Sequence, residues 1–179
     1  EEHNIGGKAM SIARIELWEG RTYDKKEELI RGWGGKNIKA KAINLSIEIM
    51  KGYRYLPHTG DLKFKATGKT LEEAFTNAAL AMLNYILDTE KVHPEIVKMV
   101  DIKAENLEAL LYTWLEEFLI LLDSEFFLPH KIKEVRITKI KDGYELRGMI
   151  NGDENKGQHR IKAVKAATYN DMEIKEKEG

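Results

Sequence analysis

The sequence N-L-E-A-L-L-Y-T-W-L-E-E-F-L-I-L-L, residues 106–122, decides the fold of this chain. Its large apolar residues recur every three or four positions, which is the spacing of one broad face of an α-helix. Asn106 is a typical N-cap residue. Glu108, Glu116 and Glu117 mark the solvent-facing side of the predicted helix. These glutamates interrupt the apolar run, so it predicts a buried helix and not a membrane span. Because each large apolar side chain contributes about 1.5–3 kcal/mol when fully buried, we expect this face to be the largest single contribution to the core.

A second helix is predicted over residues 71–88. Thr70-Leu71-Glu72-Glu73 matches a capping box, in which the Thr70 hydroxyl accepts from the amide of Glu73 and the Glu73 side chain reaches back. Apolar residues then follow at helical spacing, namely Leu71, Phe75, Ala78, Met82 and Ile86.

Residues around the two helices alternate between apolar and polar, which is typical of strands. Asp142-Gly143 between two such runs is a strong hairpin signal. We therefore predict the class α+β, with two main helices packed against a mostly antiparallel sheet. The predicted strands cover residues 53–56, 62–66, 97–104, 132–140 and 144–150, with extended segments at 161–168 and 171–174.

The first 49 residues have a pattern of their own. A strand is predicted over residues 11–18, a short helix over 24–31 and a strand over 36–49, with glycines at 32, 34 and 35 between the last two. We interpret residues 1–49 as a β-α-β-like extension of unknown role and residues 50–179 as the main domain.

Composition excludes several classes of function. The chain has 179 residues, 42% of them hydrophobic and 33% charged, and a formal net charge of -1, so its overall charge does not favour nucleic acid or an acidic membrane. It has no cysteine, which removes disulfides, thiolate zinc sites and cysteine nucleophiles and fits an intracellular setting. There is no P-loop, no G-x-G-x-x-G and no H-E-x-x-H, and no two of the histidines form a local metal pair.

His58-Thr59-Gly60-Asp61 lies between two predicted strands, where ligand-binding groups are often placed. Asp61 suits a hard cation, although turn formation explains the same residues. Asp123 ends a predicted helix, where a carboxylate is a poor match for the dipole, and solvation explains it as well. Lys162 and Lys165 fit the solvated edge of a strand.

Over about residues 51–175 the sequence resembles the archease family. The resemblance rests on Y-R-Y-L-P-H-T-G-D-L at 53–62, T-L-E-E-A-F at 70–75, L-E-A-L-L-Y-T-W-L-E-E-F at 107–118, D-S-E-F-F-L-P at 123–129 and V-K-A-A-T-Y at 164–169. It implies a non-catalytic activator of the RtcB-type tRNA-splicing RNA ligase, which promotes guanylylation and multiple turnover of the ligase and meets tRNA only indirectly. A cytoplasmic protein is expected, or a nuclear one in a eukaryote.

The resemblance also implies a site for calcium or another divalent cation, with Asp61 as a ligand. His58, Thr59, Asp123 and Lys165 become candidates for loop or partner contacts. The sequence ends at Gly179, where the family pattern continues into a last strand with a second acidic ligand. We expect residues 36–49 to be able to occupy the place of that strand.

Residues 12–32 resemble the opening of 4-oxalocrotonate tautomerase-like proteins, which use an N-terminal proline amine as a base. Ser11 stands at the position of that proline and ten residues precede it, so the inherited chemistry is expected to be absent. Three functions remain open at this point: a ligase activator with a cation, a tautomerase-like enzyme, and a metal-free interaction module.

Overall fold

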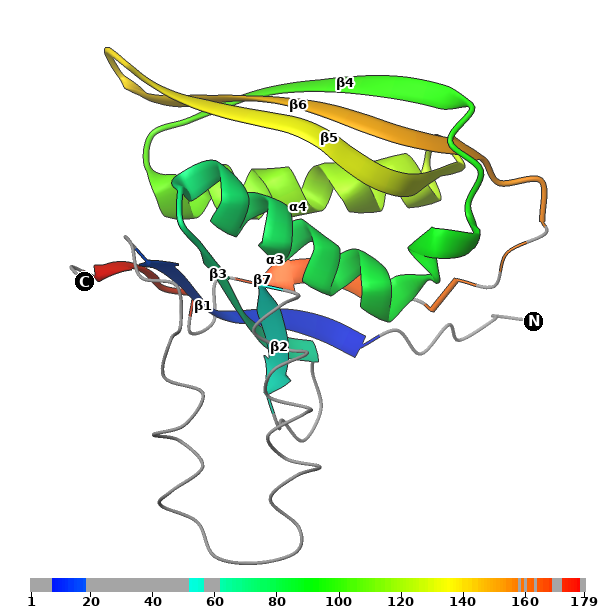
Figure 1. Ribbon diagram of the computed structural model, residues 1–179, viewed down its shortest axis with the longest axis horizontal. Helices are drawn as coiled ribbons and strands as arrows, with labels where there is room; N and C mark the ends of the chain where they lie inside the picture. Colours follow the sequence, from blue (N-terminus) through cyan, green and yellow to red (C-terminus); the bar gives the residue numbers. More distant parts are fainter. Residues whose placement is uncertain are drawn as a thin grey trace, which may run out of the picture.

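The protein consists of three layers, with the two helices between two sheets (Figure 1). The computed structural model describes residues 8–18, 52–56, 62–157, 159, 161–162, 164–168 and 172–177. The upper sheet in Figure 1 has the order β4 (Ile96–Ala104), β6 (Gly143–Glu154), β5 (Phe127–Ile140). The other sheet has the order β2 (Tyr53–Leu56), β3 (Leu62–Gly68), β1 (Lys8–Trp18), β7 (Val164–Thr168), and β8 (Ile174–Lys177) also pairs with β1.

Helices α3 (Leu71–Ile86) and α4 (Leu107–Asp123) form the middle layer and confirm the two predicted helices. Trp114 and Phe118 of α4 are fully buried, and their rings meet edge to face with centroids 4.7 Å apart. The buried face of α3 is rich in alanine, which allows neighbouring elements to approach closely; it includes Ala74, Ala78, Ala79 and Ala81. Among the described helices, none is long and apolar enough to cross a membrane.

Local hydrogen bonds begin both helices where the sequence predicts. The Glu73 amide donates to Thr70 Oγ1 at 3.2 Å, and the Ala109 amide donates to Asn106 Oδ1 at 2.8 Å. The Glu73 carboxylate accepts from the amide of Lys69 at 2.7 Å, one residue before the amide that the capping box leads us to expect. The backbone amides on both sides of Thr70, those of Lys69 and Glu73, thus have side-chain acceptors.

The upper sheet is antiparallel throughout, and its β5–β6 pair confirms the predicted hairpin. Ile140 pairs with Gly143 across a turn at residues 141–142. A Cβ at Gly143 would lie 2.1 Å from the carbonyl oxygen of Ala104, and its φ of 137° also requires glycine. β5 begins at Phe127, five residues earlier than predicted, because a break in the register beside Pro129 lets the strand pass a residue that cannot donate to the ladder.

The lower sheet is mixed, because β1 runs parallel to β3, β7 and β8, whereas β2 and β3 are antiparallel. The predicted strand at 11–18 is therefore present, as Lys8–Trp18, and it lies next to β3. The predicted helix at 24–31 and strand at 36–49 lie outside the described residues. The predicted α+β class with two main helices is confirmed.

Candidate functional site

The strands on either side of the predicted cation loop form an antiparallel pair. Leu56 of β2 lies opposite Lys63 of β3, and Tyr53 lies opposite Ala66. The ends of the two strands therefore lie side by side, and residues 57–61 connect them. His58, Thr59 and Asp61 themselves lie outside the described residues, so their role remains a prediction.

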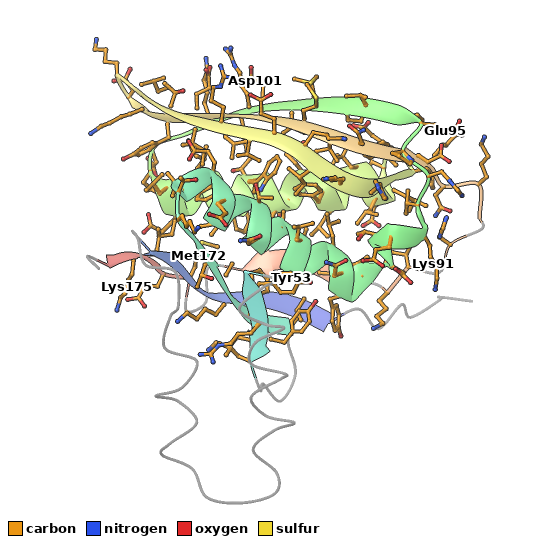
Figure 2. The ribbon with its side chains drawn as sticks, viewed as in Figure 1. Tyr53, Lys91, Glu95, Asp101, Met172 and Lys175 are labelled. Atoms are coloured by element: carbon orange, nitrogen blue, oxygen red, sulfur yellow. The ribbon has the colours of Figure 1, made fainter. Side chains whose placement is uncertain are left out.

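Three tyrosines gather where β2 packs on α3, and one of them, Tyr53, is labelled in Figure 2. The Tyr55 ring lies 5.8 Å from that of Tyr53 and 6.3 Å from that of Tyr85, measured between centroids, and both contacts are edge-on. The Tyr55 hydroxyl donates to the carbonyl oxygen of Ala81 at 2.8 Å. Burial, together with the adjoining Tyr53, raises the pKa of the Tyr55 phenol well above its ordinary value. Tyr55 is therefore held neutral at physiological pH, as a hydrogen-bond donor to the Ala81 carbonyl oxygen.

A chain of hydrogen bonds extends from this cluster to the upper sheet. The Asn84 side-chain amide donates to the Tyr53 hydroxyl at 2.8 Å, and the Thr89 hydroxyl donates to Asn84 Oδ1 at 2.9 Å. His130 Nδ1 lies 2.9 Å from the Thr89 carbonyl oxygen. The chain connects β2, α3 and β5, so it fixes the orientation of β2 relative to both layers. Sequence reasoning did not find it, because its partners are up to 41 residues apart and share no local motif.

Lys162 places a positive charge at the same cluster. Its backbone amide donates to the Ile86 carbonyl oxygen at 2.8 Å, and its ammonium nitrogen lies 4.8 Å from the centroid of the Tyr85 ring. This distance is within the range of a cation–π interaction. Sequence reasoning interpreted Lys162 as a solvated lysine on a strand; the structure shows that it is exposed, that it precedes β7, and that its ammonium group also lies over an aromatic ring.

The other candidate residues lie on separate elements. Lys165 is in β7, which runs parallel to β1, and Asp123 is the exposed last residue of α4. Within the described ranges, no three histidine, aspartate or glutamate side chains gather closely enough to hold a metal ion.

Comparisons with known proteins agree with this geometry. The model of the Archease protein family matches residues 53–179. Protein archease of Methanothermobacter thermautotrophicus is 43% identical over 131 residues, which cover 73% of this chain and 93% of that protein. Protein archease of Methanosarcina mazei is 40% identical over 131 residues, with 72% and 90% covered.

A solved structure also resembles this chain. The solution structure of Methanobacterium thermoautotrophicum protein 1598 superimposes with a TM-score of 0.59 at 38% identity, covering 67% of this chain and 86% of that one. The family model matches the part of the chain that carries β2, the tyrosine cluster, both helices and the upper sheet. The chain belongs to the archease family.

Proposed function

We propose that the protein is a non-catalytic activator of an RtcB-type RNA ligase, with a divalent cation bound at Asp61. The observation that carries the proposal is membership of the archease family over residues 53–179, a range that includes the strand pair on either side of Asp61. Such a protein needs no chemistry of its own. It acts by binding one conformation of the ligase, the one competent for nucleotide transfer, more tightly than the other.

The described residues support a binding role more than a catalytic one. Tyr55 is held neutral, and the hydrogen-bond chain from Tyr53 to His130 is directed at backbone and amide groups of the fold itself. Ser11, which stands where a tautomerase would have its catalytic amine, lies inside β1 with paired residues around it. An assay with 2-hydroxymuconate is expected to show no turnover, and turnover by the intact chain would overturn this part of the proposal.

The test of the proposal measures ligase turnover on split tRNA with and without the protein. We expect the intact chain to allow multiple turnover and Asp61→Ala to lose most of that effect. Asp101→Ala is the matched control, because Asp101 is an exposed carboxylate on the outer side of the upper sheet (Figure 2). Absence of stimulation by the intact chain would refute the proposal. Equal loss in both variants would refute the special role of Asp61.

An interaction module without a metal is the second candidate, because the described residues hold no group of three potential ligands. Calorimetry with Ca²⁺, Mn²⁺ and Mg²⁺ separates the two candidates. Binding that disappears in Asp61→Ala supports the cation, and stimulation of the ligase without any cation binding supports the metal-free module. Since ligand charge tunes calcium affinity, a site with one carboxylate and otherwise neutral oxygens is expected to bind weakly.

A further inference from the structure

The turn between α4 and β5 exposes an aromatic ring on a strained backbone. Phe126 has a φ of 52°, and it is the only residue other than glycine with positive φ in the described part of the chain. The left-handed conformation favours glycine or asparagine, because a Cβ crowds the backbone there. The Phe126 ring is nevertheless 59% exposed, so burial in the core does not compensate for this strain.

The turn itself does not require phenylalanine. Its backbone is held by the Asn155 amide, which donates to the Phe126 carbonyl oxygen at 2.6 Å. Glycine would make the same hydrogen bond without the strain and without an exposed ring. The chain reversal thus explains the positive φ of this residue. It does not explain why the side chain is aromatic.

A second exposed apolar side chain lies in the last turn of α4, next to this segment. Ile120 is 45% exposed on the side of α4 away from the core, and its carbonyl oxygen accepts from the amides of Ser124 and Glu125 at 2.9 and 3.2 Å. These bonds fold the segment before Phe126 back onto the end of the helix. Ile120 and Phe126 therefore both lie at the C-terminal end of α4.

Carboxylates lie close to this end of α4. Glu117 and Asp123 come from α4, and Glu125 from the turn; burial and the charge of Glu125 raise the pKa of the Glu117 carboxyl. Lys98 of β4 binds Glu125 at 2.6 Å and compensates the charge of that carboxylate. The last turn of α4 contains no basic residue, so the partial negative charge of the helix end adds to that of the carboxylates.

The charge of the rim selects the kind of partner. Phosphates of RNA would be repelled by Glu117, Asp123 and the helix C-terminus, whereas lysine or arginine would be attracted. An apolar centre within a charged rim is the usual anatomy of a protein interface, in which buried aromatic anchors carry most of the binding energy.

The outer face of the upper sheet is the other apolar candidate on the described surface. Val97 and Met99 are exposed there, and Met99 lies opposite Met149. Its charges already pair among themselves, since Arg147 binds both Asp101 and Glu145, at 3.2 and 3.1 Å. Two of its carboxylates are thus already paired with a cation, and this face supplies a control instead.

We propose that Ile120 and Phe126, within the rim of Glu117, Asp123 and Glu125, dock on a surface of the ligase that presents an apolar pocket flanked by lysine or arginine. This inference rests on the proposed function. It adds a contact with the ligase at the end of α4 and the α4–β5 turn. This contact is separate from the β2–β3 pair that leads to Asp61.

The first test measures binding of the full chain to the ligase by calorimetry. Phe126→Gly and Ile120→Ser are each expected to weaken binding roughly tenfold or more, which is the effect of losing an interface anchor. Met99→Ser is the matched control, because it removes an equally exposed apolar side chain from the outer face of the upper sheet, and it is expected to bind within about twofold of the unchanged protein. Phe126→Gly relaxes the backbone, so its thermal stability should not fall, and a melting curve checks this.

The second test examines charge. Binding of the unchanged chain is expected to weaken as NaCl increases, and Glu117→Gln with Asp123→Asn should reduce that dependence. Tighter binding after removal of these carboxylates would overturn the basic partner. Binding of the tRNA substrate alone that is lost in Phe126→Gly would also overturn it, in favour of RNA.

The outcomes separate the two proposals. If the unchanged chain binds and stimulates the ligase while Phe126→Gly does both equally well, the docking surface is wrong and the proposed function stands. If the unchanged chain neither binds nor stimulates the ligase, both are wrong.

Discussion

Replacing Gly148 by alanine is expected to destabilise the protein, although alanine is normally the better residue in a strand. Gly148 of β6 faces Trp114 of α4, and a Cβ there would lie 2.7 and 2.8 Å from Cη2 and Cζ3 of the indole. The indole has no room to move away, because it is fully buried and its Nε1–H donates to the Phe75 carbonyl oxygen at 3.2 Å. The edge-on contact with Phe118 confines it further.

The magnitude follows from two opposing effects. Overpacking of a closely packed core costs about 1–3 kcal/mol. Removal of glycine from a strand interior contributes roughly 0.5–1 kcal/mol in the other direction. We therefore expect Gly148→Ala to lower the free energy of unfolding by about 0.5–2 kcal/mol.

Trp114→Phe provides the decisive background, because phenylalanine lacks the outer carbon atoms that the new Cβ would meet. In that background Gly148→Ala should be neutral or stabilising. The effects of the two substitutions on the free energy of unfolding should thus differ from additivity by about 1–3 kcal/mol. Trp114→Phe alone destabilises, since it loses volume and the hydrogen bond to Phe75.

The assay is urea unfolding of the four proteins of this cycle, followed by far-ultraviolet circular dichroism. Equal slopes against urea would show that the denatured state is unchanged and that the differences belong to the folded protein. Additivity within about 0.5 kcal/mol would refute the reasoning, because it would mean that the alanine methyl and the indole do not compete for space. A Gly148→Ala variant that is more stable than the unchanged protein would refute it as well.

Three further predictions concern single side chains. Thr70→Ala removes the acceptor of the Glu73 amide and should cost about 1 kcal/mol, seen as a fall in Tm of about 2–4 °C. Glu117→Gln should raise Tm at pH 7, because the raised pKa of this carboxyl means that its charged form is disfavoured in the fold. The gain in Tm should vanish below about pH 4, where the carboxyl is protonated in the unfolded chain as well. A gain in Tm that persists below that pH would contradict the argument. The Tyr55 phenol stays protonated in the folded protein at a pH at which it ionises in the unfolded chain, so stability should decline above about pH 10. The decline should be less steep in Tyr55→Phe, which also loses the hydrogen bond to Ala81. Identical melting curves of the two proteins at alkaline pH would exclude a contribution of Tyr55 to the pH dependence.

The candidate site could be predicted only in part. Asp61 became a candidate because flanking motifs resemble a family; its own local pattern, a polar turn between strands, favours a simple turn equally well. The tyrosine cluster had no signal at all, because Tyr53 and Asn84 are 31 residues apart and meet only when β2 packs on α3. The contact of Lys162 with Tyr85 had no signal for the same reason, since the two residues lie on different elements.

What the sequence by itself determined are the features whose causes act over a few residues. Both helices, their caps at Thr70 and Asn106 and the hairpin at Gly143 follow from periodicity, from side-chain acceptors three residues before an amide, and from a backbone that only glycine adopts. The tertiary structure alone decided the three-layer arrangement, the place of β1 between β3 and β7, and the exposure of Phe126. These depend on which distant segments bury one another's apolar surface, and the free energy of that choice belongs to the whole chain and not to any one stretch of it.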